Sequence, residues 1–376
     1  MLAGTLEMNG AIDSLAVKSG GKLQIKSSGT AAGVTVGGTS KLAGSMTVIG
    51  VASSTTVQAY GNLTINGGTA NTVTVQKNGS LTLTKGTVSA LTLASGGKAQ
   101  LNGGSLSGTT KLNGGVMTVA AAGVNVGKIA AKTAAIVSYD VRSVNPGAAT
   151  AILVRGTKQA LNAGCRIVTA KLQEMGTYKL SSKLTVAKGK NFGLFQGTTK
   201  IGMAKLGTAK KLNGVSYKVT QASGVVKLTL AAVAGKMLKG DAKANQLTGT
   251  YQCDIFWGGK GNDTIIGKKG RDVVVYNKAA WGQDTIEATS GTMTLVLAGI
   301  KKIQVTRTLS DGTMTIKRKG TSQSITVKGW SADTHKIIYN AKLPDFTAYV
   351  KAASPTAGQK QAAKSAVWQK AGLASA

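Results

Sequence analysis

Carboxylate side chains recur at a fixed spacing among glycines between residues 240 and 275. Four consecutive nine-residue units begin at Gly240, Gly249, Gly258 and Gly267. The sixth position of each unit carries an oxygen-bearing side chain, in turn Asn245, Asp254, Asp263 and Asp272. Glycines permit tight turns with positive φ that bring backbone carbonyls close to a cation. A carboxylate adds the hard, charged oxygen that calcium prefers, so the spacing predicts calcium binding in the turns.

The third unit, residues 258–266, fits the pattern G-G-x-G-x-D-x-U-x in full. With these residues the segment resembles the RTX, or haemolysin-type, calcium-binding repeats. The resemblance implies a β-roll in which two units form one coil, so that Asp254 lies beside Asp272 and Asn245 beside Asp263. It also implies Ca²⁺ at one or two weak sites. The metal-site residues expected on this basis are Asp254, Gly258, Gly259, Gly261, Asp263, Gly267, Gly270 and Asp272.

The other three units depart from the pattern, which leaves a metal-free alternative open. Gln252 and Lys268 replace glycines, and Asn245 replaces an aspartate. Lysines and arginines beside the turns should weaken calcium binding by repulsion. The alternative is a set of glycine-rich turns between short strands that hold no ion.

Composition argues against an ordinary enzyme core. The 376 residues include 51 Gly and 3 Pro, only 4% are aromatic, and the net charge is +33. Such a composition suits thin, repetitive β-structure, and the strong positive charge departs from the usually acidic RTX proteins. The two cysteines, Cys165 and Cys253, lie far apart and indicate neither a disulfide framework nor a zinc site.

Residues 12–130 repeat with a period near 18. Short alternating triplets begin at Leu15, Val34, Thr55, Val73, Leu91 and Thr109. A second strand is expected seven residues after each, from Lys22, Lys41, Asn62, Ser80, Lys98 and Val116. Period-2 alternation inside a longer repeat predicts a right-handed parallel β-solenoid. Its interior should be filled by an aliphatic ladder of Val17, Val36, Val57, Val75 and Leu93, with Leu42 also directed inward.

These repeats resemble the AIDA-type repeats of bacterial surface adhesins, including autotransporter passenger domains. The predicted fold class is all-β: a right-handed parallel β-solenoid, a β-rich middle module, a short RTX β-roll and a C-terminal helix. The expected domains are residues 1–130 (AIDA-type β-solenoid repeats), 131–239 (basic β-rich module), 240–286 (calcium-binding β-roll), 287–342 (β-rich cap) and 343–376 (helical C-terminal secretion signal). For residues 131–239, a β-sandwich and an irregular continuation of the solenoid are both possible.

The C-terminal segment differs in character from the rest of the chain. Ser354 and Pro355 suit the N-cap and first residue of a helix, Gly372 suits its end, and a narrow apolar stripe is expected from Ala362, Ala366, Val367 and Ala371. This tail resembles the uncleaved signals of type I secretion substrates. No signal peptide and no apolar run long enough to span a membrane are apparent. The resemblance favours a secreted, extracellular or cell-surface protein.

No pattern in the sequence supports catalysis. The single histidine, His335, lies outside any HExxH motif, and no G-x-S-x-G or phosphate loop occurs. The predicted solenoid offers only Glu7 and Asp13, both at its leading edge, whereas glycosidases need clustered carboxylates. No catalytic residues and no organic cofactor are therefore expected, and the chain is predicted not to be an enzyme.

Two functions are consistent with these sequence features. The first is a secreted bacterial adhesin-like structural solenoid, stabilised by calcium, exported by a type I apparatus and bound to anionic surface polymers or cell-surface glycans. The alternative is a non-specific polyanion-binding module driven by net charge. Specific nucleic-acid binding is not expected, because aromatic side chains for base stacking are scattered. A plain solubilising role for lysine on the rod is a further possibility.

Overall fold

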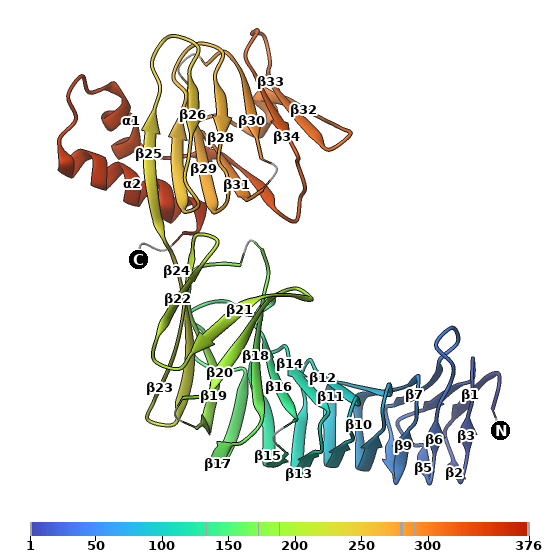
Figure 1. Ribbon diagram of the computed structural model, residues 1–376. Coiled ribbons are helices and arrows are strands. Elements are labelled where there is room, and N and C mark those ends of the chain that lie inside the picture. Colours follow the sequence, from blue (N-terminus) through green and yellow to red (C-terminus); the bar gives the residue numbers. More distant parts are fainter. Residues whose placement is uncertain are drawn as a thin grey trace. The chain divides into compact units, whose positions relative to one another are not determined.

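The chain folds into two compact units, both built mainly from strands (Figure 1). The computed structural model describes residues 2–132, 134–171, 173–187, 189–278, 281–288 and 290–373. The first unit comprises residues 1–170, 177–208 and 218–228, and the second comprises residues 171–176, 209–217 and 229–376. The predicted all-β class is confirmed.

The first unit is a β-solenoid whose early coils have three sides. Strands β1 (Thr5–Met8), β2 (Ala11–Asp13) and β3 (Ala16–Val17) pair in parallel with β4 (Lys22–Ile25), β5 (Thr30–Ala32) and β6 (Thr35–Val36). The next coil contains β7 (Gly44–Val48), β8 (Val51–Ser53) and β9 (Thr55–Val57). The coils continue through β10 (Gly61–Val75), β11 (Ser80–Leu93), β12 (Lys98–Leu101), β13 (Ser105–Leu112), β14 (Val116–Val119) and β15 (Val124–Ala131).

The predicted aliphatic ladder is confirmed. The strand register aligns Val17 with Val36, Val57, Val75 and then Leu93 in consecutive coils. All five side chains are buried. Identical inward positions recur because one coil returns the chain to the same side of the rod, and each branched side chain packs on the one before it.

The expected strand at Lys41 is wrong. Leu42 is 55% exposed and lies in a turn, where its N–H donates to Thr39 Oγ1 at 3.1 Å. Ser45, not Lys41, aligns with Lys22 and Asn62. The extra residues of this longer coil loop out before β7, so the strand begins later than a uniform spacing predicts.

The middle segment, residues 131–239, continues the solenoid. Of the two predicted possibilities, the irregular continuation is therefore correct and the β-sandwich is not. Strands β16 (Ile136–Asp140), β18 (Gly164–Thr169) and β20 (Asn191–Gln196) extend one side in parallel register. Strands β17 (Leu153–Leu161) and β19 (Gly176–Val186) extend another. Strand β21 (Thr199–Lys205) pairs antiparallel with β20, and β22 (Ala209–Leu212), β23 (Val215–Ala222) and β24 (Val225–Ala232) follow.

The second unit is a roll of two facing sheets. One contains β25 (Ala234–Lys239), β27 (Cys253–Trp257), β29 (Arg271–Tyr276), β31 (Thr292–Ala298) and β35 (His335–Ala341). The other contains β26 (Gln246–Thr248), β28 (Thr264–Ile266), β30 (Gln283–Glu287), β34 (Ser324–Lys328), β33 (Thr313–Arg318) and β32 (Val305–Ser310), which follows the short 3-10 helix η1 (Lys302–Gln304). Strands β31, β34 and β35 continue the same two sheets past residue 286.

The eighth position of each nonapeptide supplies the core of this roll. Phe256, Ile265 and Val274 are fully buried in one cluster, and Leu247 packs against it. Because strands alternate their side chains between faces, the sixth and eighth positions point the same way. The aspartates are thereby brought to the ends of an apolar interior, where water cannot easily reach them.

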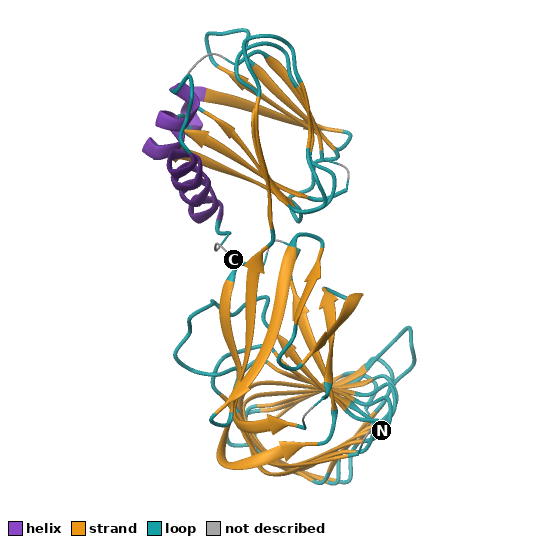
Figure 2. Cartoon of the chain, turned by 60° about the vertical axis from the view of Figure 1, so that its left-hand side comes forward, coloured by secondary structure: helices purple, strands orange, loops and turns teal. Residues whose placement is uncertain are grey.

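Two helices cover the outer face of the five-stranded sheet, which contains β25, β27, β29, β31 and β35 (Figure 2). Helix α1 (Pro344–Lys351) was not predicted, and α2 (Ala357–Ala371) begins later than expected because Thr356, not Ser354, is its N-cap and accepts from Gln359 N. The predicted stop at Gly372 is confirmed by its left-handed φ of 74°. The expected stripe is shifted, since Ala362 is exposed. The buried face consists of Ala363, Val367, Trp368 and Ala371.

Helix α2 is tied to the roll by lysine side chains at its middle and at its C-terminal end. Lys364 Nζ donates to Gly235 O at 3.2 Å, and Lys336 Nζ donates to Ala371 O at 2.7 Å. Residues 374–376 of the predicted secretion signal lie outside the described part of the chain. Among the described residues, no helix has the length and apolarity needed to span a bilayer.

The solenoid register can be tested with two adjacent substitutions. Leu81 is buried and pairs with Leu63 and Ala99, whereas Ser80 faces outward between Asn62 and Lys98. We expect Leu81→Asp to lower the free energy of unfolding by about 3–5 kcal/mol, because it buries an unpaired charge. Ser80→Lys should cost less than about 1 kcal/mol, partly restored by salt. Denaturant unfolding measures both, and equal losses would contradict the inward and outward assignment.

Candidate metal centre

The nonapeptide turns lie at the two edges of the roll, with alternate turns on the same edge. Asn245 N donates to Asp263 Oδ1 at 2.8 Å, and Asp254 N donates to Asp272 Oδ1 at 2.9 Å. Both bonds span 18 residues. The predicted pairing of sixth-position residues is therefore confirmed: Asn245 and Asp263 share one edge, and Asp254 and Asp272 share the other.

A hydrogen bond of the same type leads to Asp284, which was not among the predicted site residues. Asp263 N donates to Asp284 Oδ1 at 2.9 Å across 21 residues. Gly282, Asp284 and Ile286 repeat the fourth, sixth and eighth positions of the motif, which was the available signal. Three extra residues break the nine-residue count, so the sequence indicated a closing strand of the 240–286 roll here and no further metal ligand.

The Asp263 edge holds two buried carboxylate oxygens without a hydrogen-bond partner. Asp263 and Asp284 are each only 1% exposed. Their Oδ1 atoms accept the bonds described above, but neither Oδ2 atom accepts a hydrogen bond of ordinary geometry. The Tyr276 hydroxyl lies near Asp284 and lowers its pKa, but less than burial raises it. A buried carboxylate oxygen without a donor is costly unless a proton or a cation compensates it.

Glycines bring main-chain oxygens close to this edge. A Cβ atom on Gly258 would lie 2.2 Å from Asp263 Oδ2, so the turn wraps tightly around the carboxylate. Gly259 and Gly261 have φ values of 98° and 95°. A Cβ atom on Gly259 would lie 2.2 Å from the carbonyl oxygen of Asp241 in the preceding coil. The predicted Gly258, Gly259, Gly261 and Asp263 are therefore brought together on one edge.

The Asp254 edge is more fully satisfied by the protein itself. Asp254 Oδ1 accepts from Lys236 N at 2.5 Å, and Oδ2 accepts from Thr250 N at 2.6 Å. Thr250 Oγ1 donates to the same carboxylate at 2.9 Å. The remaining predicted residues, Gly267, Gly270 and Asp272, lie on this edge, where a Cβ on Gly267 would meet Asp272 Oδ2 at 2.4 Å.

Burial makes the ionised form of these carboxylates unfavourable. Desolvation raises the pKa of Asp272 to about 9 and that of Asp284 to about 6, and it also raises the pKa of Asp263. The negative charge of Asp263 adds to the increase at Asp284. A bound cation would reverse the effect, since it stabilises the ionised form.

The donor set suits calcium rather than a softer metal. The described residues contain no group of three or more His, Cys, Asp or Glu side chains placed to hold a metal. An ion at the Asp263 edge would need backbone carbonyls beside the Asp263 and Asp284 carboxylates, which is the mixed oxygen set that calcium accepts. Asp263, Asp284 and the turn containing Gly258, Gly259 and Gly261 would hold it.

Comparison with known families agrees with this geometry. Residues 239–274 match the RTX calcium-binding nonapeptide repeat (4 copies). The segment is thus a calcium-binding repeat of RTX type, and the match indicates that it binds Ca²⁺. No curated protein matches the chain.

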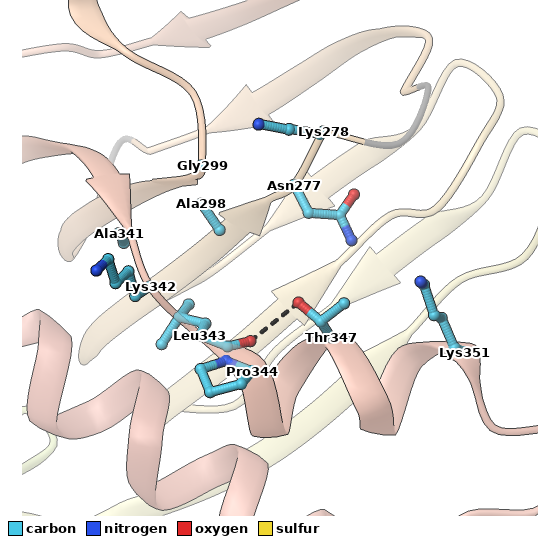
Figure 3. Close-up of a pocket in the computed structure, with 10 residues that line it drawn as sticks. All are labelled: Asn277, Lys278, Ala298, Gly299, Ala341, Lys342, Leu343, Pro344, Thr347 and Lys351. Atoms are coloured by element: carbon cyan, nitrogen blue, oxygen red, sulfur yellow. Dashed lines mark hydrogen bonds between the residues drawn. The ribbon is translucent and has the colours of Figure 1, made fainter.

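An open groove elsewhere in the roll has the wrong chemistry for a cation. Its volume is about 720 Å³, and it lies where β29, β31 and β35 end beside α1 (Figure 3). Lys278, Lys342 and Lys351 surround an apolar floor that includes Ala298 and Leu343. Its lining, as far as the structure describes it, contains no Asp or Glu, so the turns suit calcium better than this groove does.

Substitution of the unassigned aspartate tests the site. We expect Asp284→Asn to weaken calcium binding by about tenfold or more, because it removes a charged oxygen ligand. Asp311→Asn provides a matched control, since Asp311 is exposed at the turn between β32 and β33. Isothermal titration calorimetry of both variants measures the affinities. Equal affinities in the two variants would remove Asp284 from the site.

The raised pKa values predict an unusual pH dependence in the calcium-free protein. A carboxyl group whose pKa is higher folded than unfolded contributes stability at low pH, and the contribution disappears as pH rises through the folded pKa. In EDTA, the Tm of the roll should therefore fall between about pH 4 and pH 9, first through Asp284 near pH 6 and then through Asp272. Saturating calcium should abolish the fall, because bound carboxylates stay ionised. Calorimetry showing a rise in Tm over this range in EDTA would contradict the burial of these groups.

Proposed function

We propose that the chain is an exported, non-enzymatic, adhesin-like β-solenoid protein whose roll is stabilised by Ca²⁺ outside the cell. The observation that carries the proposal is the pair of unpartnered, buried carboxylate oxygens of Asp263 and Asp284. Extracellular calcium modules bind at about 10⁻⁴ to 10⁻³ M. Because burial of the Asp263 and Asp284 carboxylates is unfavourable without a cation, the site would be weak and would be filled only where calcium is abundant. The roll would therefore become fully stable only after export.

The solenoid supports a structural and adhesive role through its outer surface. The register places Gln24, Thr47, Thr64, Thr82 and Gln100 in one outward column on consecutive coils. Coils are spaced about 4.8 Å apart, so hydroxyl and amide groups form a regular polar row. Such a surface can make many hydrogen bonds to an extended polymer.

The carboxylates of the first unit support a non-enzymatic role. Glu7 forms an ion pair with Lys26 at 3.0 Å, and Asp140 accepts two hydrogen bonds from Arg142 Nε and one from Nη2. Asp13 accepts from Ser14 Oγ at 3.3 Å and is exposed. Glycoside hydrolysis needs two carboxylates facing one another across a substrate, whereas these three belong to different strands and have local partners.

The C-terminal helices support export by a type I apparatus, on the resemblance of residues 343–376 to such signals. We expect the full chain to appear in the medium of cells that carry a type I exporter, and to stay inside when the transporter ATPase is inactive. A reporter fused to residues 343–376 should follow the same pattern, which separates signal function from the packing of α1 and α2 on the roll. Immunoblots of medium and cell fractions provide the measurement. Reporter retained in cells with an active exporter would refute the assignment of the signal.

A further inference from the structure

The first unit contains a groove lined by one buried cationic side chain, that of Arg155. The groove has a volume of about 450 Å³, within the range of ligand sites in proteins. It is formed by three consecutive strands of one side of the solenoid, β13, β15 and β17. Its polar lining consists of Ser105, Ser107, Asn125, Lys128, Arg155 and Thr157, and no Asp or Glu lines it within the described part of the chain.

A break in the strand ladder creates this groove. Strand β15 pairs with β17 only at Val124 and Asn125, and β17 then bulges before it pairs again with β19 at Gln159. The coil that runs from Ile136 to its partner Gly164 is longer than the 18-residue coils before it, so extra residues must leave the sheet. The Gln159 side chain closes the gap, because Ile129 N donates to its Oε1 at 3.0 Å and its Nε2 donates to Ile129 O.

Arg155 lies in this bulge, and every protein atom that accepts a hydrogen bond from its guanidinium is neutral. The residue is only 6% exposed. Its Nε donates to Thr157 O and its Nη2 to Thr157 Oγ1, both at 3.2 Å, and its Nη1 donates to Gln159 Oε1. Among the described residues no carboxylate forms an ion pair with it. A guanidinium has five N–H groups, so donors remain after these three bonds.

A buried guanidinium without a counter-ion is a costly arrangement. Burial lowers the pKa of Arg155 from its ordinary value, yet arginine stays protonated in proteins. The charge is therefore retained in a poorly hydrated place, and an anion that enters the groove would compensate it. Lys128, exposed at the rim, adds a second positive charge.

We propose that this groove binds an acidic sugar residue of a polysaccharide, with Arg155 contacting its carboxylate or sulfate group. The hydroxyls of Ser105, Ser107 and Thr157 and the amide of Asn125 are suited to sugar hydroxyls. None of the described residues that line the groove is aromatic, so they offer a nucleic-acid base no stacking surface. The inference gives a ligand class to the adhesive role proposed above and rests on that role for its biological meaning, although binding itself can be measured independently.

The test uses the full chain and oligosaccharides of defined length at 0.15 M salt in millimolar calcium. The probes are an oligogalacturonate, a sulfated heparin oligosaccharide and a neutral dextran. The variant Asn125→Asp adds a carboxylate to the lining of the groove that Arg155 also lines, and Asn125 is exposed, so folding should survive. Asn113→Asp is the matched control, because Asn113 is exposed outside the groove and the change in net charge is the same.

We expect the unaltered chain to bind at least one acidic probe and to bind dextran at least tenfold more weakly. Asn125→Asp should weaken acidic binding by about tenfold, equivalent to about 1.4 kcal/mol, and Asn113→Asp by less than about twofold. A preference between the two acidic probes identifies the carboxylate or the sulfate as the recognised group. Isothermal titration calorimetry supplies the affinities, and Tm values confirm that both variants fold.

Arg155→Lys provides a second variant that keeps the charge but loses the planar donor fork. It should weaken acidic binding by about tenfold. Equal losses in Asn125→Asp and Asn113→Asp would show that affinity reflects bulk charge, and would overturn the proposal. So would undetectable binding of both acidic probes, or dextran binding as strong as theirs. Surface adhesion that survives in Asn125→Asp would exclude the groove while leaving the adhesive solenoid in place.

Discussion

One hydrogen bond, repeated from coil to coil, sets the geometry of the roll. A main-chain N–H in one turn donates to the carboxylate that lies one coil further along, as from Asn245 to Asp263 and from Asp263 to Asp284. The bond holds one oxygen of each aspartate at the edge of an apolar interior, and at the Asp263 edge it leaves the other buried without a donor. Structural order and calcium binding therefore have one origin: the arrangement that aligns the coils also leaves buried carboxylate oxygens that a cation would compensate.

The two edges of the roll use the same motif to different effect. At the other edge, Thr250 donates to Asp254 through both its main-chain N–H and its hydroxyl. A threonine at the second position of its unit, where the third unit has Gly259, is enough to replace part of what a cation would supply. Small changes between repeats can therefore convert a metal-dependent turn into one that the protein stabilises alone.

Sequence periodicity predicted those parts of the fold in which one coil repeats the last. The ladder from Val17 to Leu93 and the pairing of Asp254 with Asp272 follow from constant spacing, because a parallel solenoid converts spacing directly into contact. Insertions defeated the same reasoning. Extra residues displaced Leu42 from the interior, separated Asp284 from its repeat and produced the bulge at Arg155. The solenoid accommodates such residues as loops, and sequence alone does not show which residues leave the ladder.

Hydrogen–deuterium exchange of the full chain with and without calcium tests whether the ion completes the roll. We expect millimolar calcium to slow strongly the exchange of the main-chain amides of Asn245 and Asp263, whose acceptors are the carboxylates of the Asp263 edge. Amides in the solenoid ladder around Val57 and Val75 should be unchanged, because no aspartate takes part in that pairing. Equal protection of the Asn245 and Asp263 amides in EDTA and in calcium would contradict a roll completed by the ion.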